Sequence, residues 1–128
     1  MGKINIPVLV VDDYTTMRRI IRNLLEQIGF HDIDDAEDGT AALVKLRSRS
    51  FGLVISDWNM APMSGLELLK AVRADANLKG LPFIMVTAEG KPENVLAAKQ
   101  AGVNQYISKP FTVDILSKKI DTVLGVRA

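Results

Sequence analysis

The sequence predicts an α/β fold, a single domain spanning residues 1–128 with five parallel strands and five helices. Short apolar runs rich in β-branched residues recur along the chain, a pattern typical of strands buried on both faces of a sheet. Apolar residues at helical spacing follow these runs, and no linker or low-complexity segment interrupts the alternation. Alternating strands and helices favour a doubly wound parallel sheet with helices on both faces.

Five segments have the composition of strands. They are Pro7–Val11, His31–Ala36, Leu53–Ser56, Phe83–Val86 and Gln105–Ser108. The second segment carries three aspartates, and its low hydrophobicity favours an edge position in the sheet. The fourth leads into Thr87, and the fifth leads into Lys109 and Pro110.

Five helices follow from apolar spacing and from start and stop signals. The spacing predicts these inward residues: Met17, Ile20, Ile21, Leu24, Leu25 and Ile28; Ala42, Leu43 and Leu46; Leu66, Leu69 and Val72; Ile115, Leu116, Ile120 and Val123. Thr15 or Thr16 is predicted to cap the first helix, and the second is predicted to start at Asp38-Gly39. Ser64 and Glu67 can form a capping box at the third. Pro92 fits the first turn of the fourth helix, and Thr112 can cap the fifth. The predicted ends of the first and fourth helices are Gly29 and Gly102.

The composition narrows the class of protein. Lys and Arg total 16 against 15 for Asp and Glu, and this balance argues against a nucleic-acid-binding surface. The absence of cysteine excludes disulfides and thiol catalysis. The chain enters its first strand without a signal-peptide pattern, and no apolar run approaches the length of a membrane span. We therefore expect a cytoplasmic monomer that binds neither nucleic acid nor membrane.

Acidic residues stand at the ends of two apolar strands. Asp12 and Asp13 follow the first strand, and Asp57 follows the third. In open α/β sheets the ligand site lies beyond the carboxyl ends of the strands, so both strands can deliver carboxylates to one crevice. Clustered carboxylates raise one another's pKa and stay ionised only beside a cation. An all-oxygen cluster suits magnesium or calcium.

Two further strand ends complete a site suited to phosphoryl chemistry. The fourth strand ends at Thr87 and the fifth at Lys109, so a hydroxyl and an amine can join the carboxylates. Phosphoryl transfer needs a metal, a cation over the phosphoryl oxygens and an in-line nucleophile. A carboxylate can be that nucleophile, and Asp57 is the best candidate. Asp12 and Asp13 are better placed to hold the metal.

Five motifs together resemble the receiver domain of two-component signalling. They are Asp12-Asp13, Asp57-Trp58-Asn59-Met60, Thr87-Ala88-Glu89, Lys109-Pro110-Phe111 and Ala36-Glu37-Asp38-Gly39. The resemblance covers essentially the whole chain. Within the family it is strongest to the single-domain chemotaxis regulators of the CheY type, through residues 13–25 and Gly65–Lys70.

The resemblance implies a sheet order of 2-1-3-4-5 and a role for each strand-end residue. Asp57 would accept a phosphoryl group from a histidine kinase. Magnesium would be held by Asp12, Asp13, Asp57 and the backbone carbonyl of Asn59. Lys109 and Thr87 would bind the phosphoryl oxygens, and Thr87 with Tyr106 would report the modification to a distant face. The Lys109-Pro110 peptide bond is cis in this family.

The resemblance also implies partners. They are a CheA-type histidine kinase, the flagellar motor switch protein and, as a further candidate, a phosphatase. The fourth helix, fifth strand and fifth helix would form the docking face, with these candidate residues: Lys91, Val95, Lys99, Tyr106 and Lys119. The sequence departs from the family on or near that face, at Gly90, Pro92, Gln105 and Ser108, so these departures bear on which partner the protein binds.

Other functions remain open. A receiver of this kind can act as a phosphate sink or a relay shuttle that never contacts a motor. A magnesium-dependent phosphohydrolase is disfavoured, because such enzymes have an acid where this chain has Asn59, which cannot transfer a proton. A flavin carrier is disfavoured by the acidic Asp12-Asp13 pair after the first strand. We predict slow self-dephosphorylation and no catalytic turnover.

Several residues have an ordinary structural interpretation. Arg18, Arg19 and Arg22 are predicted to lie on a solvated helix face, and His31 in a surface turn. Trp58 is predicted to be partly exposed beside the site.

Overall fold

The computed structural model describes residues 5–88 and 91–125, and strands alternate with helices throughout. The strands are β1 (Val8–Val11), β2 (Ile33–Ala36), β3 (Leu53–Asp57), β4 (Phe83–Thr87) and β5 (Gln105–Ser108). The helices are α1 (Thr15–Ile28), α2 (Gly39–Ser48), α3 (Gly65–Ala74), α4 (Pro92–Gln100) and α5 (Val113–Leu124). Within the described residues, none of these helices has the length and apolar character needed to cross a membrane. Glu89 and Gly90, which the sequence analysis singled out, lie outside the described residues.

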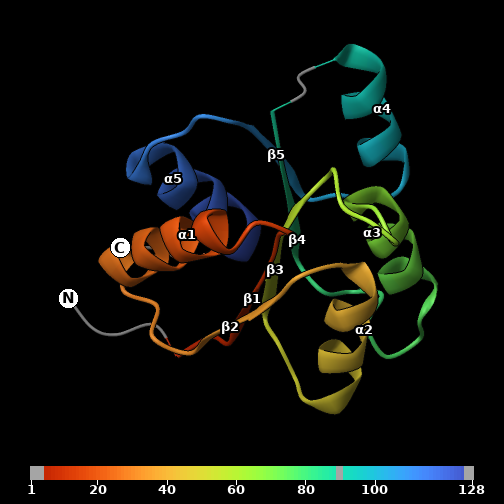
Figure 1. Cartoon of the computed structure of the whole chain (residues 1–128), viewed down its shortest axis with the longest axis horizontal. Helices are drawn as coiled ribbons and strands as arrows, with labels where there is room; N and C mark the ends of the chain where they lie inside the picture. The colour runs from red at the N-terminus through yellow and green to blue at the C-terminus, as the bar shows by residue number, and fades with distance from the viewer. Residues whose placement is uncertain (1–4, 89–90, 126–128) are drawn as a thin grey trace.

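The five strands form one parallel sheet in the order β2-β1-β3-β4-β5, which confirms the predicted topology. β2 lies at one edge, as its acidic composition predicted, and β5 lies at the other. Helices α1 and α5 cover one face of the sheet, and α2, α3 and α4 cover the other (Figure 1). The chain is therefore a three-layer sandwich in which the carboxyl ends of all five strands share one edge.

Two apolar cores lie on the two faces of the sheet. Side chains alternate along β1, so Val8 and Val10 enter the core under α1 and α5, whereas Leu9 and Val11 enter the core under α2 and α3. The buried helix residues in the first core are Ile21, Leu25, Leu116 and Ile120, and those in the second are Ala42, Leu43, Leu46, Leu68, Leu69 and Val72. Fully buried strands on both sides explain the near-continuous apolar runs in the sequence.

Most helix boundaries have the predicted chemistry. Asp38 Oδ1 accepts from the Ala41 backbone N–H at 2.8 Å at the start of α2. The capping box of Ser64 and Glu67 is present in both directions at α3, and Thr112 Oγ1 accepts from the Ile115 N–H at α5. The prediction for α1 was wrong. Its N-cap residue is Tyr14, whose side chain makes no capping hydrogen bond, and Thr15 is already helical.

Three predicted inward residues are not part of either apolar core. Ile20 and Ile115 are 44% and 43% exposed, because the neighbouring Ile21 and Leu116 take the buried positions. Leu66 is half-buried, because α3 turns Leu68 and Leu69 toward the core instead. Adjacent apolar residues on a helix cannot all face the same core, and the sequence does not say which one faces inward.

Candidate functional site

The carboxyl ends of four strands bring together the residues that the sequence analysis singled out. Asp12 follows β1, Asp57 ends β3, Thr87 ends β4 and Lys109 follows β5. The parallel register sets these ends beside one another, with Val11 opposite Ser56, Asp57 opposite Val86 and Thr87 opposite Ser108. The Lys109 backbone N–H donates to the Thr87 carbonyl at 2.8 Å, which extends the pairing of β4 with β5 to the site.

Three carboxylates gather at this edge of the sheet. Asp12, Asp13 and Asp57 each present one oxygen, and these atoms all lie within 4.8 Å of one another. Asp12 and Asp57 are buried, whereas Asp13 is exposed. The cluster therefore has two carboxylates held in the protein interior and a third at the solvent boundary.

Lys109 supplies positive charge to the cluster. Its Nζ donates to Asp57 Oδ1 at 3.0 Å and lies 3.5 Å from Asp12 Oδ2. The Lys109-Pro110 peptide bond is cis, as the resemblance implied, and Ala61-Pro62 is cis as well. One ammonium group thus bridges the two buried carboxylates, and it compensates only part of the charge of the three acids.

Burial makes ionisation of the two inner carboxylates less favourable than in water. Desolvation raises the pKa of Asp57 above its ordinary value of 3.8, although the hydrogen bond and the charge of Lys109 oppose the shift. Desolvation also raises the pKa of Asp12, and the charges of Asp57 and Asp13 add to that effect. A cation that binds all three acids would remove this electrostatic cost.

Asp12 carries a buried oxygen that fits a metal ion. Its Oδ1 accepts from the Tyr14 backbone N–H at 2.9 Å, but its Oδ2 is buried and makes no hydrogen bond with any described residue. Buried polar atoms are nearly always satisfied, and the charged neighbour of Asp12 Oδ2 is Lys109 Nζ at 3.5 Å, so this oxygen has the capacity to bind a cation beside the two further carboxylates. Hard divalent cations such as Mg²⁺ take oxygen ligands of this kind. The donor set therefore fits magnesium.

Gly65 is a residue of the site to which the sequence analysis gave no role. A Cβ at this position would lie 2.1 Å from the Asp57 carbonyl oxygen and 2.9 Å from Met85 Sδ. The Gly65 N–H also donates to the Trp58 carbonyl at 2.8 Å. The start of α3 is therefore in direct contact with the backbone of Asp57, and a glycine directly after the capping Ser64 was the only signal of this contact.

Trp58 and Tyr106 connect the site to the β5 edge of the sheet. Both side chains are half-buried, as predicted for Trp58, and their rings meet edge to face, with centroids 6.3 Å apart and an interplanar angle of 66°. Trp58 directly follows Asp57, and Tyr106 lies opposite Met85 in the pairing of β4 with β5. An aromatic contact thus joins the loop after Asp57 to β5.

A surface cavity of about 450 Å³ lies on the predicted docking face. It is lined by Val95, Lys99, Val103, Asn104, Gln105, Tyr106 and Lys119. The structure therefore brings together four of the five predicted partner residues, and Lys91, the fifth, is exposed at the start of α4. Lys119 Nζ donates to Gln105 Oε1 at 3.2 Å. Two lysines at an open cavity favour an acidic partner segment.

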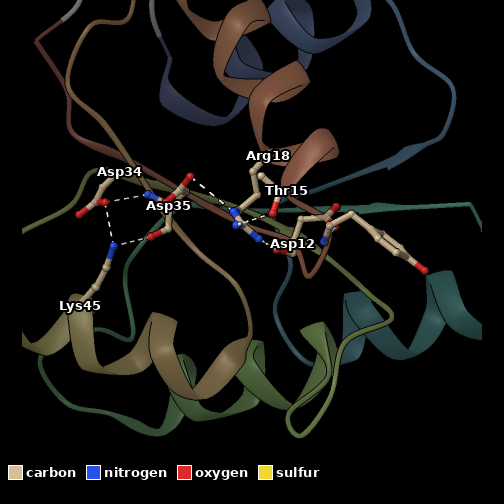
Figure 2. A network of polar contacts seen from close by, with 7 residues as sticks. Asp12, Thr15, Arg18, Asp34, Asp35 and Lys45 are labelled. Atoms are coloured by element: carbon tan, nitrogen blue, oxygen red, sulfur yellow. Dashed lines mark hydrogen bonds and ion pairs between the residues drawn. The ribbon is translucent and has the colours of Figure 1, made fainter.

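The sequence interpretation of Arg18 was wrong. Arg19 is exposed and Arg22 is half-buried, but the Arg18 side chain is only 15% exposed. Its guanidinium turns back toward Asp12, Thr15 and Asp35 (Figure 2). Helical spacing predicts which face a residue occupies, but it does not show that a long side chain folds back along the helix toward the first turn.

Comparison with known proteins identifies the family. Residues 8–121 match the response regulator receiver domain, and the chain belongs to that family. It is 53% identical to the chemotaxis protein CheY of Pseudomonas aeruginosa over 116 residues, which cover 91% of this chain and 94% of that protein. It is 50% identical to CheY-3 of Vibrio cholerae over 119 residues, covering 93% and 92% of the two chains.

Comparison with a solved structure leads to the same family. The structure of Vibrio cholerae CheY4 superposes with a TM-score of 0.88 at 36% identity and covers 94% of this chain and all of that one. The chain is thus a receiver domain of the CheY type of chemotaxis response regulator, a class whose signalling depends on phosphorylation.

Proposed function

We propose that this protein is a phosphorylation-activated switch of chemotaxis, with Asp57 as the phosphoryl acceptor. The observation that carries the proposal is the site itself, in which Lys109 Nζ lies 3.0 Å from Asp57 Oδ1 and the oxygens of three carboxylates lie within 4.8 Å of one another. A carboxylate oxygen of Asp57 attacks the phosphorus of a phosphohistidine on a CheA-type kinase. The new O–P bond replaces the P–N bond, and the imidazole leaves.

In this proposal each residue of the site has one task. Asp12, Asp13, Asp57 and the backbone carbonyl of Asn59 would hold Mg²⁺, which would supply positive charge to the site during transfer of the phosphoryl group. Lys109 and the hydroxyl of Thr87 bind those oxygens once Asp57 is modified. Asn59 cannot act as a general acid or base, so the acyl phosphate is lost by slow self-dephosphorylation, aided by a phosphatase partner, and not by enzymatic turnover.

The output of the switch is binding through the α4-β5-α5 face. Phosphorylation draws Thr87 toward the site and shifts Tyr106, whose ring already contacts Trp58. The target is an acidic segment of the flagellar motor switch protein, which docks at the cavity lined by Val95, Lys99 and Lys119. Lys91, exposed at the start of α4, is a further candidate contact. Couplings of this kind are typically about 1–3 kcal/mol.

The proposal has consequences for the whole protein. In this proposal residues 1–128 act as one cytoplasmic, monomeric receiver domain that binds neither nucleic acid nor a membrane. The alternative within the family is a phosphate sink or relay shuttle, which shares the chemistry at Asp57 and lacks the motor partner. Binding to the motor protein therefore distinguishes the two, whereas phosphorylation alone does not.

The test uses Trp58, the only tryptophan in the chain, as a fluorescent reporter. Magnesium and then acetyl phosphate should each change its fluorescence, and intact mass should show one phosphoryl group, absent from Asp57→Asn. Beryllofluoride with magnesium should then tighten binding to an acidic motor-switch peptide. Equal peptide affinity with and without beryllofluoride would favour the sink, and the absence of Mg²⁺-dependent phosphorylation would overturn the proposal.

A further inference from the structure

We propose that Arg18 is a positioning residue of the magnesium site, acting through the peptide that joins Asp12 to Asp13. The inference rests on the function proposed above and extends it to a residue outside the carboxylate cluster. Arg18 lies on the first turns of α1, and its guanidinium contacts no carboxylate of the cluster directly. Arg18 acts instead through its hydrogen bond to the backbone carbonyl of Asp12.

Each nitrogen of the Arg18 guanidinium has a separate contact (Figure 2). Nη1 donates to the Asp12 backbone carbonyl at 2.7 Å, and Nη2 donates to Thr15 Oγ1 at 3.3 Å. Nε is buried and faces Asp35 Oδ2 at 3.4 Å, outside the geometry of a hydrogen bond. The planar group therefore links the end of β1, the first turn of α1 and the edge strand β2.

The contact with the Asp12 carbonyl has a direct consequence for the two metal-holding acids. That carbonyl belongs to the peptide group between Asp12 and Asp13, so holding it sets the orientation of the backbone from which both carboxylates extend. The Asp12 N–H donates to the Ala36 carbonyl at 3.2 Å, and Asp12 Oδ1 accepts from the Tyr14 N–H. Because Arg18 donates to the Asp12 carbonyl, both the N–H and the C=O of Asp12 are hydrogen-bonded.

A second ion pair, between Lys45 and Asp34, lies next to Asp35 on β2. Lys45 Nζ, from α2, donates to Asp34 Oδ1 at 2.9 Å and to the Asp35 backbone carbonyl. Asp34 Oδ1 also accepts from the Asp35 N–H at 2.8 Å. Figure 2 shows the resulting line of contacts from Lys45 through Asp34 and Asp35 to Arg18 and Asp12. The backbone of Asp35, whose carboxylate faces Arg18 Nε, is thus held by contacts with Asp34 and Lys45.

Charge and geometry make opposite predictions for the loss of Arg18. Arg18 is a cation near a site for a cation, so by Coulomb repulsion alone its removal should tighten magnesium binding. If Arg18 positions Asp12 and Asp13, its removal should weaken binding. Outer residues that orient metal ligands typically contribute about 10-fold to 100-fold in metal affinity. The sign of the change therefore separates the two effects.

The experiment compares Arg18→Ala, Arg18→Lys and Arg19→Ala with the wild-type protein. Magnesium dissociation constants are measured by Trp58 fluorescence and by calorimetry, and unfolding free energies by urea. We expect about 10-fold weaker magnesium binding in both Arg18 variants, because lysine keeps the charge but cannot make two hydrogen bonds and an ion pair in one plane. Arg19→Ala removes the same charge from the exposed neighbouring position and should stay within about twofold.

Unchanged or tighter magnesium binding in the folded Arg18 variants would overturn the proposal. A lower unfolding free energy with unchanged magnesium affinity would show a structural role only, and loss of the fold in both variants would have the same meaning. If Arg18→Ala alone fails to fold, Arg18→Lys carries the test. Failure of the wild-type protein to bind magnesium or accept phosphate would instead count against the function proposed above, so the two failures are distinguishable.

Discussion

The α-carbon of Gly65 packs against the peptide carbonyl of Asp57, so closely that a Cβ at position 65 would lie 2.1 Å from the carbonyl oxygen. The close approach arises because α3 begins directly beside the end of β3, with the Gly65 N–H donating to the Trp58 carbonyl. The backbone position of the proposed phosphoryl acceptor therefore depends on the absence of a side chain eight residues later in the chain.

Gly65→Ala should accordingly lower the free energy of unfolding and disturb Asp57. Overpacking of a tight contact typically costs about 1–3 kcal/mol, and here the obstructing atom is backbone and cannot rotate away. Urea unfolding measures the loss, and the rate of phosphorylation by acetyl phosphate reports on Asp57. Gly80→Ala is the matched control, because a Cβ there has nothing within 4 Å, and it should change stability by less than about 0.5 kcal/mol.

The raised pKa of Asp57 predicts a pH dependence of stability in magnesium-free buffer. The folded protein holds this proton to a higher pH than the unfolded chain, whose carboxyl titrates near 3.8. The folded state thus binds more protons in the window from about 3.8 to the raised pKa. The contribution of Asp57 to the free energy of unfolding is fully present below 3.8 and is lost as pH rises through this window.

Asp57→Asn removes this titration and leaves unchanged the groups outside the site, such as Asp34, whose lowered pKa has the opposite effect on stability. The variant also removes the charge that helps to raise the pKa of Asp12, and this second effect has the same direction. Subtracting the wild-type free energy of unfolding from that of the variant should give a difference that increases with pH and then levels off. A difference that decreases with pH would show that the Lys109 contact outweighs the burial of Asp57.

Magnesium should stabilise the folded protein through the three carboxylates. A ligand that binds only the folded state adds about 2.7 kcal/mol to the free energy of unfolding at 100 times its dissociation constant, and a chelator should reverse the gain. Asp13→Asn separates metal binding from folding, because Asp13 is exposed. Its stability without metal should stay within about 0.5 kcal/mol of wild type, while the gain from magnesium shrinks. If magnesium stabilises Asp13→Asn as much as it stabilises the wild-type protein, Asp13 is not a magnesium ligand.

Lys109→Met should have opposite effects on the binding of magnesium and on the response to the phosphoryl group. Loss of an ammonium 3.0 Å from Asp57 and 3.5 Å from Asp12 leaves the acids less compensated, so magnesium should bind more tightly, by about tenfold. The anionic phosphoryl group would lose its cation, so beryllofluoride should no longer enhance peptide binding. Magnesium titration and peptide titration measure the two effects on one sample. Weaker magnesium binding would contradict the compensating role assigned to Lys109.

The sheet and the strand-end residues could be predicted from sequence for one physical reason. Buried parallel strands are nearly continuous apolar runs, so the first polar residue after each run marks the carboxyl end of the strand. Asp12 and Thr87 stand in this position, and Asp57 comes one residue later, after Ser56. Lys109 follows the more polar fifth strand, and the structure brings all four residues to one edge of the sheet. The spatial order of the strands came from the family resemblance.

Features that depend on side-chain direction or close packing could not be predicted in the same way. The turn of Arg18 back toward Asp12 depends on where β2 places Asp35, which is a tertiary contact. The contact of Gly65 with Asp57 depends on the distance between α3 and β3. Ile115 and Leu116 were both predicted to be buried because they are apolar, yet the rotation of α5 buries Leu116 and leaves Ile115 exposed.

Arg73 forms a polar cluster at the end of α3 that is far from the site in the fold. Its Nε donates to the Gly102 carbonyl at 3.0 Å, and its Nη1 donates to the Lys79 and Leu81 carbonyls at 2.9 and 2.7 Å. Its Nη2 donates to Asn104 Oδ1 at 3.0 Å. One guanidinium thus joins α3 to the loops that precede β4 and β5.

Arg73→Ala should lower the free energy of unfolding by about 3 kcal/mol, because charge-assisted hydrogen bonds contribute about 1.5–3 kcal/mol each and are not additive. Arg73→Lys should recover only part of the loss, since one ammonium cannot reach carbonyls in several directions. Urea unfolding gives both values. Magnesium affinity should stay at the wild-type value in each folded variant, because Arg73 lies near the amino end of β4, whereas the carboxylates lie at the carboxyl ends of β1 and β3. A parallel loss of magnesium affinity would mean that the amino-terminal loops and the site are coupled through the sheet.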